Sequence, residues 1–294
     1  MSEVQLQFQT PPSVWSIYAK LLVAQKSAVV PDGGVVPRLE ATLSDVTVDA
    51  ARLASYREVC GDRCTEYLPI AYPHVLASGM QLAMLSVPQF PVRLLGLVHV
   101  RNLIEQRRPL LSSETGALHC HLSGHRDTIV GQEFDLNTQW IAQDGSVPWI
   151  EVCTFLARKR TAGANRPRAA AAAAMDEVPR VETVSFAAPA GLGRRYGRIA
   201  GDLNPIHLSD LSAKLFGFKA AIAHGMWSLA RCAAELDAGM LAGACSLDVS
   251  FKLPVFLPSW LMLEKRIGAD ATQFVLYDAQ GEKPHLTGRL ARLA

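Results

Sequence analysis

The chain has 294 residues, of which 49% are hydrophobic and 19% charged, which is too apolar for a disordered chain and typical of a packed globular protein. The formal net charge of +2 gives no basic surface of the kind that binds nucleic acid. No apolar run approaches the ~20 residues that span a bilayer, and the first ten residues lack the apolar segment of a secretory signal. We therefore expect a cytoplasmic protein with no nucleic-acid or membrane partner.

In chain order, the first half begins with a helix-rich region, and strands follow it. The segments with strand-like composition are Val92–Val100, Ala117–Ser123, Gly131–Ala142 and Pro148–Arg158. Between the halves, Ala157–Met175 is rich in arginine and alanine and has no alternating apolar pattern. We interpret residues 158–178 as a linker between a domain over 1–157 and a domain over 179–294. Its basic residues are expected to face solvent and not to bind substrate phosphates.

The second half repeats this order of helix and strands. Five side chains fall on one face of a predicted helix: Met226, Leu229, Ala230, Ala233 and Leu236. Four strands are predicted after it, at Leu247–Phe256, Trp260–Arg266, Thr272–Asp278 and Thr287–Leu293. Helices followed by strands, without alternation of the two, indicate an α+β fold in each half.

Three short matches, in the same order in both halves, indicate an internal repeat. YREVCGD (Tyr56–Asp62) matches YGRIAGD (Tyr196–Asp202) at an offset of 140 residues. Ser78-Gly79-Met80 and His224-Gly225-Met226 each begin an apolar segment at an offset of 146, and a proline after a basic stretch recurs at an offset of 145. Matches at a nearly constant offset predict two copies of one fold.

The segment 196–226 contains the residues with the clearest chemical potential. Gly201 permits a sharp turn, and Asn204 followed by Pro205 is typical of a helix start. Asp202 and His207 therefore lie on either side of a bend, and their side chains can converge on one point. A carboxylate beside an imidazole is a suitable acid/base pair for activating a water molecule.

A second element follows at Ala223–Met226, where the apolar helix begins. The first N–H groups of a helix are unpaired and lie at the positive end of its dipole, and Gly225 has no side chain to block approach. The Gly225 N–H is therefore a candidate donor to a carbonyl oxygen that gains negative charge. In isolation, Gly-Asp followed by Asn-Pro is more often a turn and a cap; the ordered set GDLNPIH, Gly217-Phe218 and AHGM favours the catalytic interpretation.

These residues resemble the signature of the MaoC-like dehydratase family, which includes the R-specific enoyl-CoA hydratases of hot-dog fold. The residues that carry the resemblance are Tyr196, Gly201, Asp202, Asn204, Pro205, His207, Ala213, Gly217, Phe218, His224, Gly225 and Met226. It continues through VSFKLPVF, and in the first half through YPHVLASGM and VHVRNLIEQRRPL. The resemblance implies a tandem (double) hot-dog fold, in which each half is a long helix wrapped by an antiparallel sheet.

The resemblance also implies an activity, the reversible hydration of trans-2-enoyl thioesters to (3R)-3-hydroxyacyl thioesters. Asp202 and His207 would activate the water, and the Gly225 N–H would polarise the thioester carbonyl. Asn204, His224 and Tyr196 are the expected supporting residues. The implied substrate is an acyl-CoA or acyl carrier protein thioester, no metal or other cofactor is required, and the chain could form a homodimer.

The first half departs from this pattern. After Gly61-Asp62 it has neither Asn-Pro nor a histidine five positions after the aspartate. We therefore expect one active site per chain, with the first half making room for the acyl tail. Two alternatives stay open: a hot-dog thioesterase, and a non-catalytic subunit that binds acyl thioesters.

Three other patterns have simpler interpretations than a site. Gly191–Gly197 (GLGRRYG) is close to a dinucleotide-binding motif but has the wrong spacing, so it predicts a turn and a helix start. His119 and His121 would share one face of a strand near the surface, and not bind a metal. The six cysteines are predicted to be reduced, with Cys60 and Cys64 buried.

Overall fold

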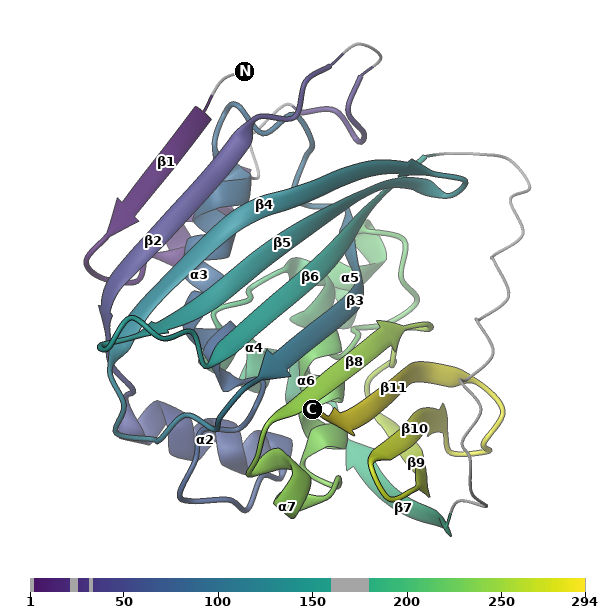
Figure 1. The fold of residues 1–294 in the computed structure, drawn as a ribbon. Helices are drawn as coiled ribbons and strands as arrows, with labels where there is room; N and C mark the ends of the chain where they lie inside the picture. The colour runs from purple at the N-terminus through teal and green to yellow at the C-terminus, as the bar shows by residue number, and fades with distance from the viewer. Residues whose placement is uncertain (1–2, 22–25, 32–33, 160–179, 294) are drawn as a thin grey trace.

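The computed structural model describes residues 3–21, 26–31, 34–159 and 180–293 (Figure 1). The first half contains, in chain order, β1 (Glu3–Phe8), α1 (Val14–Leu21), β2 (Arg38–Val46), α2 (Ala50–Cys60), α3 (Tyr72–Ser86), β3 (Leu97–Gln106), β4 (Gly116–Thr128), β5 (Gly131–Ala142) and β6 (Trp149–Arg158). The second half contains β7 (Arg180–Ala188), α4 (Leu192–Ala200), the 3-10 turn η1 (Pro205–His207), α5 (Asp210–Leu215), α6 (Gly225–Ala233), α7 (Ala238–Leu241), β8 (Cys245–Phe251), β9 (Ser259–Ile267), β10 (Ala271–Asp278) and β11 (Pro284–Arg292).

The described strands form one sheet, in the order β1-β2-β4-β5-β6-β3-β8-β11-β10-β9-β7. Its centre is the antiparallel pair of β3 and β8, in register from Arg101 opposite Ser250 to Gln106 opposite Cys245. From this pair outward, the first half has β3, β6, β5 and β4, and the second half has β8, β11, β10 and β9. The two halves therefore repeat one topology, as the internal matches predicted.

The helices lie together on one face of the sheet, with α3 and α6 at its centre (Figure 1). Burial alternates along β5, whose inward face includes Phe134, Leu136 and Trp140. This period of two is the pattern of a strand with one face against the core. One continuous cluster of buried residues extends through both halves. The predicted α+β fold, a helix wrapped by antiparallel strands in each half, is confirmed.

Several predicted boundaries were wrong. The strand placed at Val92–Val100 runs from Leu97 to Gln106, because Gly96 has a left-handed backbone (φ 128°) and interrupts the extended chain. Helix α3 begins at Tyr72, well before Ser78, with Pro73 in its first turn. Helix α6 ends at Ala233 and leaves Leu236 outside. The strands β1, β2 and β7 and the helix α1 were not predicted.

Most of the predicted linker, residues 160–178, lies outside the described residues, and so does most of its basic cluster. The division into domains at 157 and 179 stays a prediction. None of the described helices has both the length and the apolar character needed to cross a membrane.

Candidate active site

The segment after α4 forms the bend that the sequence predicted. Gly201 ends the helix in a left-handed conformation (φ 74°). Asn204 caps η1, accepting a hydrogen bond from the Ile206 N–H through its side-chain oxygen, and Pro205 is in the first turn. Asp202 and His207 consequently lie on opposite sides of a short turn, as expected.

The structure brings Asp202, His207 and His224 together. One nitrogen or carboxylate oxygen from each of the three side chains lies within 4.8 Å of the others. The two imidazole rings stack with their centroids 3.7 Å apart. His224 Nε2 lies 3.1 Å from the backbone oxygen of Asp202 and 3.7 Å from Oδ2 of its carboxylate. The predicted acid/base pair therefore has a second imidazole beside it.

Hydrogen bonds to backbone carbonyls indicate where the imidazole protons are. His207 Nδ1 lies 2.8 Å from the Ile222 oxygen, and a carbonyl can only accept, so Nδ1 carries the proton and Nε2 is free to act as a base. By the same argument, His224 donates its Nε2–H to the Asp202 carbonyl. Burial lowers the pKa of His207, and it lowers the pKa of His224 to about 3. Both rings are therefore neutral at pH 7.

Asp202 is the charged member of the group. Partial loss of water around the carboxylate would by itself raise its pKa, but the neighbouring His224 and His207 and a hydrogen bond from Tyr18 outweigh this effect and lower the pKa to about 2. The carboxylate is therefore ionised at neutral pH. Its side chain is 42% exposed, so a small molecule can reach it.

Tyr18 is a site residue that the sequence did not indicate. Its hydroxyl donates to Asp202 Oδ1 at 2.7 Å, and the Asn204 N–H donates to the same oxygen at 3.1 Å. Tyr18 lies on α1, 184 positions before Asp202. No local pattern could have connected two segments so far apart.

Gly225 is the first residue of α6, as predicted. His224 is the N-cap residue, and its side chain makes no capping hydrogen bond. The first N–H groups of this helix are thus available to an acceptor. A β-carbon at Gly225 would lie 3.1 Å from Cε1 of Phe251, a close contact that the glycine avoids.

Two glycines of α4 allow the segment from Asp202 to His207 to lie directly against that helix. A β-carbon at Gly193 would lie 1.9 Å from the His207 backbone oxygen, and one at Gly197 would lie 2.6 Å from the Asp202 backbone oxygen. Both glycines belong to GLGRRYG, for which the sequence predicted only a turn and a helix start. The structure confirms the helix start, with Gly191 as N-cap, and adds this close approach. Two glycines four positions apart on one helical face were the available signal.

The other predicted supporting residue, Tyr196, is buried between the two halves. Its ring lies 5.1 Å from the ring of His224 and 6.1 Å from the ring of Tyr56. Tyr56 is the matching residue of the first half, so the repeated tyrosines meet at the pseudo-symmetric centre. Tyr196 therefore packs beside His224 and limits where that ring can move.

The copy of the motif in the first half has the turn but not the histidine. Gly61 ends α2 in a left-handed conformation (φ 72°), and Asp62 Oδ1 accepts the Cys64 N–H at 2.9 Å, as Asp202 Oδ1 accepts the Asn204 N–H. Five residues after Asp62 the chain has Tyr67, where the second half has His207. The backbone turn is shared by the two copies, and the acid/base pair is not.

The other sequence patterns concern the histidines of β4 and the cysteines. His119 and His121 share one face of β4, with ring centroids 5.7 Å apart. All six cysteines are free thiols. Cys60 is buried as predicted, whereas the prediction for Cys64 was wrong: it is exposed, because it follows the turn that ends α2.

The three site side chains are also close enough to coordinate a metal ion. His224, however, uses its Nε2–H on a backbone carbonyl, and its Nδ1 is buried without a hydrogen-bond partner in the described part of the chain. The groups free to meet a ligand are therefore the Asp202 carboxylate and His207 Nε2. This pair suits the handling of water and protons better than a three-ligand metal centre.

Comparisons with known proteins place the chain in a family. A family model described as a MaoC like domain matches residues 173–273. A 3-hydroxyacyl-thioester dehydratase X of Mycobacterium tuberculosis is 31% identical over 265 residues, covering 90% of this chain and 93% of the relative. The crystal structure of HtdX from the same organism aligns with a TM-score of 0.74 at 28% identity, over 86% of this chain and 100% of that one. A MaoC-like dehydratase from Phytophthora capsici has the same fold, with a TM-score of 0.69 at 18% identity over 88% of this chain and 95% of that one. The chain belongs to the MaoC-like dehydratase family.

Proposed function

We propose that this protein catalyses the reversible hydration of trans-2-enoyl thioesters to (3R)-3-hydroxyacyl thioesters. The observation that carries the proposal is the convergence of an ionised Asp202 and a neutral His207, with its basic Nε2 free, on one accessible point. The relative of M. tuberculosis named as a 3-hydroxyacyl-thioester dehydratase supports the same class of reaction.

In the hydration direction, Asp202 and His207 hold one water molecule. As the water oxygen bonds to C3, one of its protons passes to this pair, and the pair then delivers a proton to C2. The negative charge that develops on the thioester oxygen is stabilised by the Gly225 N–H at the start of α6. The hydroxyl is added at C3 and the hydrogen at C2, so the atoms balance without a redox cofactor.

His224, Tyr18 and Asn204 act on this pair and not on the substrate. His224 and Asn204 restrain the backbone and carboxylate of Asp202 by hydrogen bonds, and Tyr18 fixes its Oδ1. A carboxylate that is held in place by several donors loses little freedom when the substrate binds. The first half would make room for the acyl chain, and the carrier would be CoA or acyl carrier protein.

The test is the rate at which the absorbance of an enoyl thioester disappears, together with chiral analysis of the product. Asp202→Asn and His207→Ala should each lower turnover at least ~10²-fold while circular dichroism stays unchanged. Near-normal turnover in both variants would refute the mechanism. Asp62→Asn, at the matching turn of the first half, is the control and should keep full activity.

A thioesterase of the same fold is the alternative enzyme, and it would release a free thiol from the substrate. The free basic nitrogen of His207 next to the carboxylate favours hydration, because one water is handled by two groups that can exchange a proton. Loss of enoyl absorbance without thiol release would support the hydratase, and thiol release would support hydrolysis. A non-catalytic binding subunit would show neither.

A further inference from the structure

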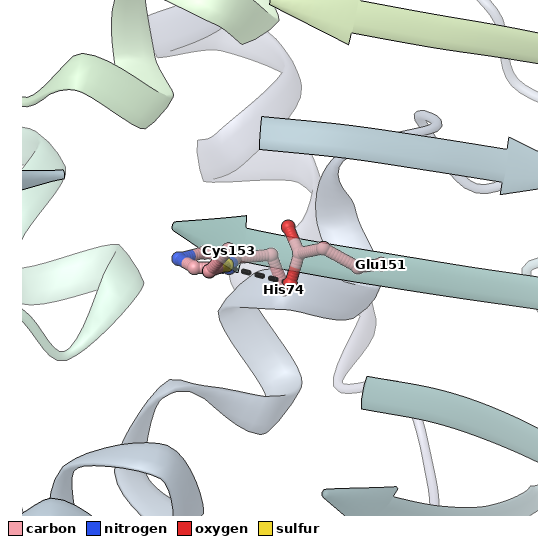
Figure 2. Close-up of side chains that lie close together, drawn as sticks. All are labelled: His74, Glu151 and Cys153. Carbon is pink, nitrogen blue, oxygen red and sulfur yellow. Dashed lines mark hydrogen bonds and ion pairs between the residues drawn. The ribbon is translucent and has the colours of Figure 1, made fainter. Parts of the chain in front are cut away.

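A second polar cluster lies in the core of the first half, where His74 of α3 meets two residues of β6. His74 Nδ1 is 2.9 Å from Glu151 Oε2, and Cys153 Sγ is 3.7 Å from the same nitrogen (Figure 2). Asn102 of β3 donates its side-chain N–H to the other carboxylate oxygen, Oε1, at 2.8 Å. The Glu151 side chain has no exposed surface. A fully buried carboxylate is costly unless it is paired, so this arrangement requires a specific role or strong compensation.

His74 and Glu151 form an ion pair when the His74 ring is protonated, and the carboxylate favours that form. Although burial opposes the charge on the ring, Glu151 raises the pKa of His74 above its usual range. The pKa of Glu151 is lowered by His74 and Asn102 despite its burial. With Nδ1–H directed to Glu151, the protonated ring has one remaining donor, the Nε2–H on its opposite side. Within the described part of the chain the hydrogen bonds of the His74 ring are both at Nδ1, and the His74 side chain is 13% exposed.

The His74 ring is connected to the candidate active site through two other rings, those of His99 and Phe251. The rings of His74 and His99 have centroids 6.3 Å apart, and the His99 ring lies 5.0 Å from the ring of Phe251. The same Phe251 ring lies against Gly225. A continuous set of side chains thus leads from the candidate oxyanion donor to His74.

A metal site is the other use that this cluster suggests, since its three ligand atoms lie within 4.8 Å of one another. Both oxygens of Glu151 are already engaged by N–H donors, from His74 and Asn102. Burial also raises the pKa of the Cys153 thiol, which keeps it protonated and a poor ligand. The cluster is therefore a closed hydrogen-bonded pair with one donor left over.

We propose that His74, held by Glu151, binds an uncharged oxygen on the acyl chain of the substrate, so that the preferred acyl group carries a hydroxyl or keto oxygen. The inference rests on the proposed function, which places the thioester at Gly225 and the acyl chain on the side of the first half. An uncharged oxygen is favoured over a carboxylate because Asp202 and Glu151 already place two negative charges nearby, and a third would be repelled. In this role His74 is a specificity residue that does not touch the reacting carbons.

The test measures binding, so that it does not depend on turnover. The probes are saturated acyl-CoA pairs of equal length, in which one member carries a hydroxyl or keto oxygen at successive carbons beyond C4. Calorimetric titration of the unmodified protein should show at least one oxygenated probe binding roughly tenfold more tightly than its plain partner, as expected for a hydrogen bond to a charged donor. Equal binding of every pair would overturn the proposal, and so would tightest binding of an ω-carboxyl probe.

Two kinds of variant separate recognition from a structural role. His74→Gln keeps a donor for Glu151 but removes the second ring donor, and the double variant His74→Met with Glu151→Leu removes both charges together, which avoids leaving one buried and unpaired. Each should abolish the preference for the oxygenated probe and leave binding of the plain probe within about twofold. His99→Phe keeps a stacked ring but removes Nε2 of His99, which is buried without a hydrogen-bond partner among the described residues. This variant should retain the preference, and its loss here would assign the oxygen contact to His99 and overturn the proposal. If the variants weaken binding of the oxygenated and the plain acyl-CoA probe equally, the cluster has only a structural role and the proposal is wrong.

Failure of the proposed hydratase function can be distinguished from failure of the assignment of His74. Asp202→Asn should abolish turnover of every enoyl thioester while it leaves the binding preference intact. If the unmodified protein hydrates none of the enoyl thioesters but still prefers the oxygenated probe, the hydratase proposal fails and the assignment of His74 stands.

Discussion

Replacing Gly225 by proline would remove one N–H group from the start of α6 without breaking the helix. Gly225 is the first helical residue, a position where proline is tolerated, and His224 before it has φ −65° and ψ 139°, which suit a residue that precedes proline. The change therefore deletes the candidate oxyanion donor. Loss of one such donor lowers kcat by about 10²–10³-fold, or about 2.7–4 kcal/mol of transition-state stabilisation.

The matched control is Gly225→Ala. Both variants place a β-carbon 3.1 Å from the Phe251 ring, but only alanine retains the N–H. The assay is stopped-flow measurement of enoyl-thioester hydration at saturating substrate, with thermal unfolding to verify that both variants fold. We expect alanine to lower kcat by about tenfold or less and proline to lower it by a further ~10²-fold. Equal kcat in two folded variants would refute the role of this N–H.

The remaining predictions concern the groups that hold the acid/base pair. Tyr18→Phe removes a hydrogen-bond donor from the charged Asp202 carboxylate. It should therefore lower kcat/KM by about tenfold and raise the pKa of Asp202. The pH dependence of kcat/KM measures both effects. Gly193→Ala should reduce activity strongly at an unchanged circular dichroism spectrum, since its β-carbon would displace the His207 carbonyl; activity near that of the unmodified protein would contradict the close approach. The free energy of unfolding should fall as pH decreases from about 6.5 toward about 3, because His224 takes up a proton in the unfolded state and stays neutral when buried in the folded state. Urea titrations at pH 7 and pH 5 measure this fall, which should be smaller in His224→Asn.

The parts of the site that follow local rules were predictable from the sequence. A glycine that permits a left-handed turn, an asparagine cap and a proline in the first turn determine the backbone around Asp202 over a few residues. The start of α6 at Gly225 was predictable for the same reason. The repeat was predictable because two copies of one fold place the same turn after a helix at a nearly constant offset, at Gly61 and at Gly201.

The parts that depend on distant packing were not predictable. Tyr18 reaches Asp202 only because α1 folds back onto the second half, and α1 has no strong pattern of its own. The pairing of His74 with Glu151 joins a helix to a strand 77 positions away. Strand boundaries also shifted where one residue changed the backbone, as Gly96 did before β3. A single sequence contains no direct record of such contacts.

The antiparallel pairing of β3 with β8 joins the two halves into one sheet, and the covalent chain keeps them together in a ratio of one to one. A separated half would expose this strand as an edge with unpaired N–H and C=O groups, which invites pairing with another copy. Because a single chain supplies both partners, they always meet in equal number and need not be identical. The two halves can therefore differ in sequence at matching positions, as they do where the second half has His207 and the first half has Tyr67.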